Sequence, residues 1–184
     1  MLKKILISLV VLVVLFVVII ALQPADFKYT RSSTFEVSPN ILFEKTNNLH
    51  QWQDWSPWAK IDPNAKTSYQ GPDAGVGASF SWDGNNEVGA GTMTITESRA
   101  NELIRMKLDF KKPFEATNDT EFTFKADGSK TTMTWSMSGK NNFMGKAFGL
   151  FVDCDKMIGD QFEKGFANLK TLVAINLNSA VEAK

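Results

Sequence analysis

The sequence predicts an α+β domain in which an antiparallel, curved sheet of about seven strands wraps on a long C-terminal helix, preceded by one transmembrane helix. Three observations lead to this fold class. The chain opens with an unbroken apolar run, continues with segments in which apolar and polar residues alternate, and ends with the three-and-four spacing of an amphipathic helix. Packing the final helix against the apolar faces of the strands buries both surfaces.

The N-terminal segment is predicted to cross a membrane. Lys3 and Lys4 precede a run of 18 residues, Ile5 to Leu22, in which Ser8 is the only polar residue. As a helix this run would reach about 27 Å, which spans the hydrocarbon core of a bilayer. A cleaved signal peptide is the competing interpretation. However, the run is longer than the usual apolar region of such a peptide, and "IALQPADF" offers no good cleavage site, so an uncleaved anchor is expected.

The chain is expected to divide into four parts, namely an anchor over residues 1–22, a linker over 23–26, one domain over 27–175 and a C-terminal tail over 176–184. About 150 residues are enough for a domain with a single core. Without its two N-terminal lysines the chain keeps 18 of its 20 basic residues against 20 acidic residues, so the soluble part is close to neutral. Nucleic acid is therefore not expected as a partner.

The domain is expected outside the cytoplasm, which means the periplasm if the protein is bacterial. Lys3 and Lys4 favour a cytoplasmic N-terminus, whereas Lys28 and Arg31 beyond the apolar run make the charge bias shallow. A long C-terminal domain is translocated largely regardless of such charges. Cys154 is the only cysteine, so no intrachain disulfide can form, and this is compatible with either side of a membrane.

The domain is predicted to open with a strand and two short helices. "FKYTRSSTFEV" alternates as a half-buried strand does. Ser38 and Pro39 indicate a helix start, because a serine hydroxyl can cap the first free amides and proline suits the first turn. This helix should end at about Asn47, and a second should run from about Leu49 to Trp55.

The middle of the chain is predicted to form antiparallel strands with one wet and one apolar face. Alternation marks "ASFSW", "GTMTITES", "LIRMKLDF", "TEFTFKAD" and "TTMTWSMSG". "DGNN" and the pair Asp127 and Gly128 indicate tight turns, because these residue types tolerate positive φ. Lys112 and Pro113 break the pattern between two strands.

The last element is predicted to be an amphipathic helix of about seven turns. Its three-and-four spacing is carried by Phe148, Val152, Asp155, Ile158, Phe162, Gly165, Phe166, Leu169 and Leu172.

This order of elements resembles the SRPBCC superfamily, the helix-grip fold of START-related lipid-transfer domains, birch pollen allergen-like proteins and polyketide cyclase or dehydrase-like proteins. "SPNILFEKTNNLHQWQDWSPW" is similar to the opening of that family, "DPNAKTSYQGPDAGVGASFSW" with "GAGTMTITES" to its next hairpin, and "FEKGFANLK" to its terminal helix. The resemblance covers about residues 27–175. It implies a cavity between sheet and helix that usually receives a hydrophobic or amphipathic small molecule. Members also include cyclases, sensors and proteins without a known ligand, so the fold does not by itself give the function.

The stretch "WQDWSPWAK" sets Trp52, Trp55 and Trp58 at intervals of three. Pro57 disfavours helix at the residue before it, so the helix should stop near Trp55 and leave Trp58 in a loop. One interpretation is an aromatic plug that closes one end of the sheet. A second is that Trp55 or Trp58 lines the mouth of the cavity, and a third is a membrane-interface role.

Several residues are candidates for ligand binding because they share the apolar strand faces or the tryptophan stretch. Methionine and aromatic walls adapt to varied ligands, but they are also ordinary core filling, and both interpretations stay open. The candidates are Trp55, Trp58, Phe80, Trp82, Met93, Met106, Phe122, Met133, Trp135 and Arg31.

Two charged residues share the parity of apolar neighbours on their strands. Glu97 has the parity of Met93 and Ile95, and Arg31 has the parity of Tyr29. A charge on an apolar face must be paired or wet, so either residue could anchor the polar group of a ligand. Alternatively, both lie at strand ends, where parity means little.

The sequence offers no cofactor motif and no metal site. His50 is the only histidine, so a Ser-His-Asp arrangement would have to be built around it, and a surface or capping position is expected instead. The glycines of "GPDAGVGA" precede a strand where a dinucleotide loop needs a helix. "DGNNE" lacks the rest of a calcium loop.

Three functions remain. The first is a membrane-anchored, non-enzymatic domain that binds a hydrophobic or lipid-like small molecule, with the membrane as its other partner. The second is a cyclase or dehydratase-like enzyme in which Glu97 or another carboxylate of the cavity acts as acid or base, although one histidine leaves few groups suited to the task. The third is a structural or regulatory envelope domain with a filled core.

Overall fold

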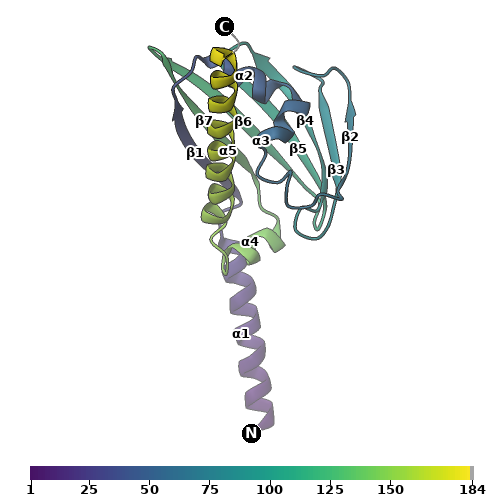
Figure 1. The fold of residues 1–184 in the computed structure, drawn as a ribbon. Coiled ribbons are helices and arrows are strands. Elements are labelled where there is room, and N and C mark those ends of the chain that lie inside the picture. The colour runs from purple at the N-terminus through teal and green to yellow at the C-terminus, as the bar shows by residue number, and fades with distance from the viewer. Residues whose placement is uncertain (183–184) are drawn as a thin grey trace.

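The computed structural model describes the backbone of residues 1–182 and the side chains of residues 1–175. One antiparallel sheet packs against a long C-terminal helix, and an apolar N-terminal helix extends away from this domain (Figure 1). The predicted fold class is therefore confirmed. The elements are α1 (Leu2–Leu22), β1 (Asp26–Phe35), α2 (Pro39–Asn47), α3 (Leu49–Trp55), β2 (Lys66–Gln70), β3 (Ser79–Asp83), β4 (Ala90–Arg99), β5 (Leu103–Lys112), β6 (Ala116–Asp127), β7 (Lys130–Lys140), α4 (Phe143–Gly149) and α5 (Cys154–Glu182).

The sheet has the strand order β1-β7-β6-β5-β4-β3-β2, and all neighbouring strands are antiparallel. Its two faces differ as the alternation predicts. On β7, Met133, Trp135 and Met137 are buried toward the helices, whereas Thr134 on the other face pairs its hydroxyl with Ser32 of β1 at 2.8 Å. The helical side of the sheet is therefore the side where a core or a cavity can form.

The register of the ladder determines which loops lie at the end of the sheet where α1 joins. β1 begins at Asp26, soon after α1 ends at Leu22, and Asp26 pairs with Lys140 at the end of β7. Each further pairing continues this edge across the sheet, as far as the start of β2 opposite the end of β3. We refer to this edge as the α1 end. The connections at the α1 end are residues 56–65, 84–89, 113–115 and 141–142.

The two short helices have the predicted bounds, but only one of them is capped by a side chain. The hydroxyl of Ser38 donates to Asn40 Oδ1 at 2.6 Å and makes no cap hydrogen bond, so the expected serine cap of α2 is wrong. Asn48 caps α3, because its Oδ1 accepts from the N–H groups of His50 at 2.9 Å and Gln51 at 3.2 Å. The second cap fixes the start of the helix that carries Trp52 and Trp55.

The last helix begins later than its spacing predicts. Phe148 belongs to α4, and Val152 lies in the turn before α5, which starts at Cys154. Asp153 sets this start, because its Oδ1 accepts a main-chain N–H of the first turn at 2.9 Å. At the other end, α5 continues into the stretch predicted as a tail, 176–184, of which residues 183–184 lie outside the described residues.

An aromatic cluster centred on Trp135 joins the sheet to α3 and α5. The ring of Trp135 stacks on Phe162 with the centroids 4.1 Å apart, and it meets Trp52 and Trp55 edge-on at 5.3 and 5.8 Å. Gly165 allows α5 to approach this closely, since a Cβ there would lie 2.9 Å from the ring of Trp135. Trp52, Trp135 and Phe162 of this cluster also form one wall of a cavity.

Candidate functional site

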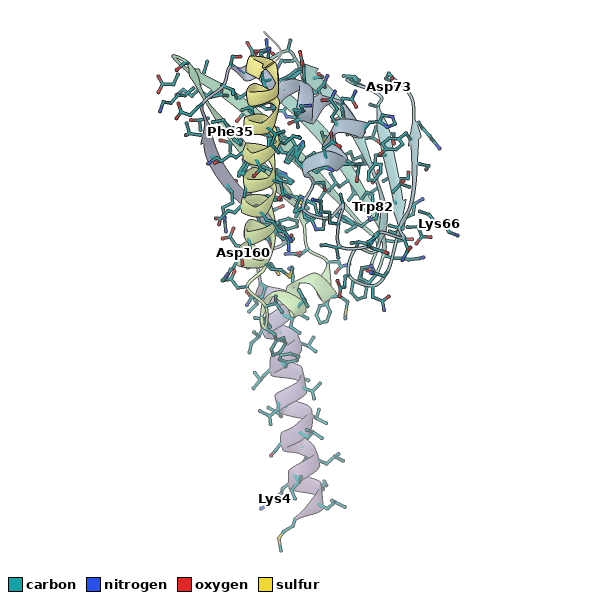
Figure 2. All side chains as sticks on the ribbon, in the orientation of Figure 1. Lys4, Phe35, Lys66, Asp73, Trp82 and Asp160 are labelled. Carbon is teal, nitrogen blue, oxygen red and sulfur yellow. The ribbon has the colours of Figure 1, made fainter. Side chains whose placement is uncertain are left out.

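A cavity of about 450 Å³ lies between the sheet, the segment after α3 and the first turns of α5. Small-molecule sites in proteins have volumes of about 300 to 1,000 Å³ and mostly apolar linings. Trp82, which lies on the lining, and Lys66 are in the lower half of the sheet, toward α1 (Figure 2). The aromatic, methionine, leucine and isoleucine residues of the lining are Trp52, Trp58, Phe80, Trp82, Met93, Leu108, Phe110, Trp135, Met137, Ile158 and Phe162.

The inner part of the cavity is formed by side chains that are almost fully buried. Met93 of β4, Trp135 of β7 and Phe162 of α5 are 5, 2 and 1% exposed. Strand alternation brings the first two to the helical side of the sheet, and the helical period of α5 turns the third toward them. The result is an apolar surface that an apolar guest could cover at little cost in lost hydration.

The mouth of the cavity is formed by loops at the α1 end of the sheet. Pro63, Glu87 and Pro113 line the cavity, are exposed, and come from the connections before β2, between β3 and β4, and between β5 and β6. Asp62 Oδ2 accepts the N–H of Asn85 at 2.7 Å, which ties two of these loops together. The cavity therefore opens at the same end of the domain from which α1 extends.

Two further contacts hold the rim in place. The indole Nε1 of Trp82 donates to the carbonyl oxygen of Val88 at 3.0 Å, which fixes the ring against the β3–β4 loop. Lys112 Nζ donates to Asp83 Oδ1 at 2.9 Å, and this hydrogen bond lowers the pKa of Asp83. The rim thus combines apolar walls with a positive charge already engaged by a carboxylate.

The tryptophan stretch divides as the proline predicts. α3 ends at Trp55, which is fully buried and donates from Nε1 to the carbonyl oxygen of Lys45 at 3.0 Å. Trp58 follows in the loop and lines the cavity. Trp52 also lines the cavity, meets the ring of Trp135 edge-on, and was not among the predicted candidates.

The structure gathers half of the predicted ligand-binding residues around the cavity and packs most of the others into the core. The residues that line the cavity are Trp58, Phe80, Trp82, Met93 and Trp135. The residues that are buried without lining it are Trp55, Met106, Phe122 and Met133. The seven of these residues that lie on strands share one face, and alternation does not encode which of them line the cavity.

Arg31 lies against α5 and is not part of the cavity lining. Its guanidinium donates to Asp155 Oδ1 and Oδ2 at 3.1 and 2.9 Å, and its Nε lies 3.4 Å from Glu163 Oε1. The hydrogen bond to Asp155 raises the pKa of Arg31 and lowers that of Asp155. Gly159 provides the space for this side chain, because a Cβ there would clash with the guanidinium. Arg31 therefore links β1 to α5 through an ion pair.

Glu97 is turned away from the cavity by a β-bulge. The register between β4 and β5 shifts between Ile95 and Glu97, so residues beyond this point change face. Glu97 Oε2 accepts from Arg105 NH1 at 2.6 Å on the outer face, while Ser98 points inward and donates to Asn47 Oδ1 at 2.8 Å. The parity that assigned Glu97 to the apolar face is wrong for this reason.

The alternation of apolar and polar residues indicates some of the lining residues and gives no sign of others. Leu108, Phe110 and Met137 continue apolar faces that the alternation had already identified. Asp62 and Glu87 lie in connections with no periodicity, and only the ladder register brings these connections together. No pattern within either loop could have indicated that they share a rim.

His50 and the glycine-rich stretch have structural positions. His50 stacks on Tyr69 with ring centroids 3.7 Å apart, at the surface and away from the cavity lining. Gly71, Gly75 and Gly77 have φ of +79°, +80° and +90°, as expected of turns. Among the described residues, no cluster of histidine, cysteine or carboxylate side chains could hold a metal ion.

Comparison with known families and structures gives one family and one fold. The sequence pattern of the family described as polyketide cyclase / dehydrase and lipid transport matches residues 26–174. Comparison with curated proteins gives no match.

Three solved structures illustrate the likeness in fold. The Mll3558 protein from Rhizobium loti has a TM-score of 0.61 at 15% identity, over 81% of this chain and 98% of that chain. Protein CV1439 from Chromobacterium violaceum has a TM-score of 0.58 at 12% identity, over 79% and 96%. Major latex-like protein 151 from Panax ginseng has a TM-score of 0.57 at 14% identity, over 80% and 97%. At these identities the likeness shows the fold alone.

Proposed function

This chain belongs to the polyketide cyclase / dehydrase and lipid transport family, and from that premise we propose that it is a membrane-anchored domain that binds a hydrophobic or lipid-like small molecule in the cavity between its sheet and its C-terminal helix. Its membership of the SRPBCC superfamily and its helix-grip fold agree with this function. The observation that carries the proposal is the cavity itself, with a volume of about 450 Å³ and walls of aromatic, methionine and aliphatic side chains.

The wall chemistry favours an adaptable apolar guest. Met93 and Met137 supply flexible, polarisable side chains, and Trp58 and Trp82 supply broad flat surfaces. Lys112 at the rim carries the positive charge of the lining. Its ammonium group donates one hydrogen bond to Asp83 and is more than half exposed, so a further donor stays available for an acidic headgroup. A ligand with an apolar body and a polar or acidic end fits this distribution.

The anchor is α1, which is long and apolar enough to cross a membrane by its length and composition. A signal sequence would satisfy the same criteria. The proposed arrangement has residues 1–22 in the bilayer with the N-terminus in the cytoplasm, a short linker over 23–26, and the domain over 27–175 outside. The cavity would then be held near a source of apolar ligands.

A cyclase or dehydratase role would require a carboxylate at the cavity. Glu97 cannot fill this role from the outer face of the sheet, which leaves Asp62 and Glu87 at the rim. Both oxygens of Asp62 already accept main-chain N–H groups, from Asn64 at 3.0 Å and Asn85 at 2.7 Å. Glu87 is exposed in the loop between β3 and β4, away from the buried inner part of the cavity. The geometry therefore favours binding over acid–base catalysis.

The first prediction concerns a ligand that co-purifies with the protein. Native mass spectrometry of the detergent-extracted full chain, with identification of released small molecules, should show a bound apolar compound. Leu108→Trp replaces an isobutyl side chain with a bulkier indole ring in the cavity and should lower occupancy at least about tenfold, which corresponds to about 1.4 kcal/mol.

The matched control is Lys107→Trp, which adds the same side chain at the neighbouring position on the exposed face of β5. It removes only an exposed ion pair with Asp109 and should leave occupancy and folding unchanged. Equal occupancy in both variants, with both folded by circular dichroism, would place any ligand outside the cavity and refute the proposal.

A further inference from the structure

α4 and the turn after it carry a group of exposed apolar side chains. Phe143, Met144, Phe148 and Phe151 are 46, 58, 50 and 76% exposed, and we call these four residues the α4 surface. No residue of α4 is buried. Large apolar side chains gathered in this way on one part of a surface mark a site of interaction with a protein or a membrane.

The α4 surface is continuous with α1. The ring of Phe151 lies 6.3 Å from that of Phe16, measured between centroids, and Lys146 Nζ donates to the carbonyl oxygen of Ala21 at 3.1 Å. The second contact satisfies one of the free carbonyl groups at the end of α1. Figure 1 shows α4 beside the point where α1 meets the domain.

The depth of Phe16 in α1 indicates what covers the α4 surface. Phe16 precedes the end of α1, at Leu22, by six residues, which is about 9 Å along the helix axis. If the run from Ile5 to Leu22 fills the hydrocarbon core, Phe16 lies inside its boundary, and Phe151 reaches the same depth because the two rings are in contact. Interfacial helices bury their apolar faces to a depth of about 5 to 10 Å.

We propose that the α4 surface is a second membrane contact, which lies in the interface of the bilayer that α1 crosses. The occupant is the lipid of that leaflet, and the inference rests on the proposed membrane anchor. Lys146 then lies at the level of the headgroups, where its stem covers apolar surface and its amine stays polar.

This contact would also orient the cavity. The mouth of the cavity lies at the α1 end of the sheet, and beside Pro113 on its rim the ring of Phe114 is 63% exposed. A domain held by both α1 and the α4 surface presents this end to the bilayer. Apolar ligands would then pass between the membrane and the cavity with little exposure to water.

The test uses the full chain in nanodiscs made of phosphatidylethanolamine and phosphatidylglycerol. Cys154→Ser removes the natural thiol, and a fluorophore sensitive to its surroundings is attached at a single new cysteine. Phe148→Cys reports on the α4 surface, Ser8→Cys on the N-terminal half of α1, and Ser129→Cys on the β6–β7 turn at the far end of the sheet. Quenching is measured with nitroxide-labelled lipid and with aqueous iodide.

The inference predicts that nitroxide lipid quenches the probes at residues 8 and 148, with blue-shifted emission, while iodide quenches only the probe at residue 129. A probe at residue 148 that behaves like the one at residue 129, with residue 8 still quenched by lipid, would overturn the inference and leave the anchor intact. Loss of lipid quenching at residue 8 would overturn the anchor, and the inference with it.

Discussion

At the scale of single residues, the two tyrosines of the chain have environments that disfavour ionisation. Burial, followed by the nearby Cys154, raises the pKa of Tyr29 to about 12. Burial, followed by the charge of Asp54, also raises the pKa of Tyr69, whose ring stacks on His50. A raised pKa in the folded state means that the phenols stabilise the fold below about pH 10, where free tyrosine ionises, and that this contribution is lost as the pH rises through the folded value.

We therefore predict that less than half of the tyrosine side chains of the folded protein are ionised at about pH 10. The ultraviolet absorbance of tyrosinate checks this, with the denatured chain as the reference. In Tyr69→Phe the remaining transition should have its midpoint near pH 12, because Tyr29 is then the only tyrosine left. A midpoint near pH 10 in this variant, with circular dichroism of the folded state, would contradict the described environment.

Single residues also show where sequence reasoning succeeds and fails. Pro57 correctly separated Trp55 in the helix from Trp58 in the loop, because the restriction before proline is local. Parity misplaced Glu97, because a bulge depends on how β4 pairs with β5 and leaves no mark in the strand itself. A rule that depends on neighbouring residues, such as the restriction before proline, therefore gave the correct structure, whereas strand parity failed where it depended on pairing with another strand.

At the scale of elements, α5 is positioned by two glycines that face the sheet. Gly159 makes room for the guanidinium of Arg31, and Gly165 for the rings of Trp135 and Trp55. The three-and-four spacing identified the helix and its buried stripe, which includes Phe162, but not where the helix begins. Phe148 and Val152 continue the spacing but precede α5, which begins at Cys154 behind the cap by Asp153.

A methyl group at Gly165 should weaken the packing of α5. Because the new Cβ would lie 2.9 Å from the ring of Trp135, an overpacking cost of about 1 to 3 kcal/mol should outweigh a gain of about 1 kcal/mol in helix propensity. Gly165→Ala should therefore lower the free energy of unfolding by up to about 2 kcal/mol. Denaturant unfolding of the full chain in detergent, followed by tryptophan fluorescence, measures this.

The control is Gly149→Ala at the end of α4, where an added Cβ meets nothing within 4 Å. It should change the free energy of unfolding by no more than about 1 kcal/mol, in the stabilising direction. If both variants had equal stability, the close approach of α5 to the aromatic cluster would be disproved.

At the scale of the whole molecule, the ladder register brings together features that are far apart in sequence. Three loops form the mouth of the cavity at the α1 end, and α4 lies at that end as well. The strands, their faces and the helix-grip order could be read from the sequence, because each depends on periodicity or on a family pattern. The cavity lies between Trp58 and Met93, whereas the region around Met106 is filled by the core. This difference depends on packing between segments, which no single segment encodes.

The methionines distinguish the cavity from the core and from the surface. Met93 and Met137 line the cavity, and Met106 and Met133 are buried without lining it. Met144 belongs to the exposed α4 surface. A ligand in the cavity should therefore change the surroundings of two methyl groups in particular.

Binding of an apolar ligand in the cavity can be followed at single methionine methyl groups. The measurement is a nuclear magnetic resonance titration of the full chain in nanodiscs, with the methionine methyl groups labelled with carbon-13 and with anilinonaphthalene sulfonate as the aromatic probe. We predict saturable shifts of the Met93 and Met137 methyl signals with little change at Met106 and Met133. Shifts confined to Met144, with the Met93 and Met137 signals unmoved at saturation, would show that the probe binds outside the cavity and would refute the proposed binding site.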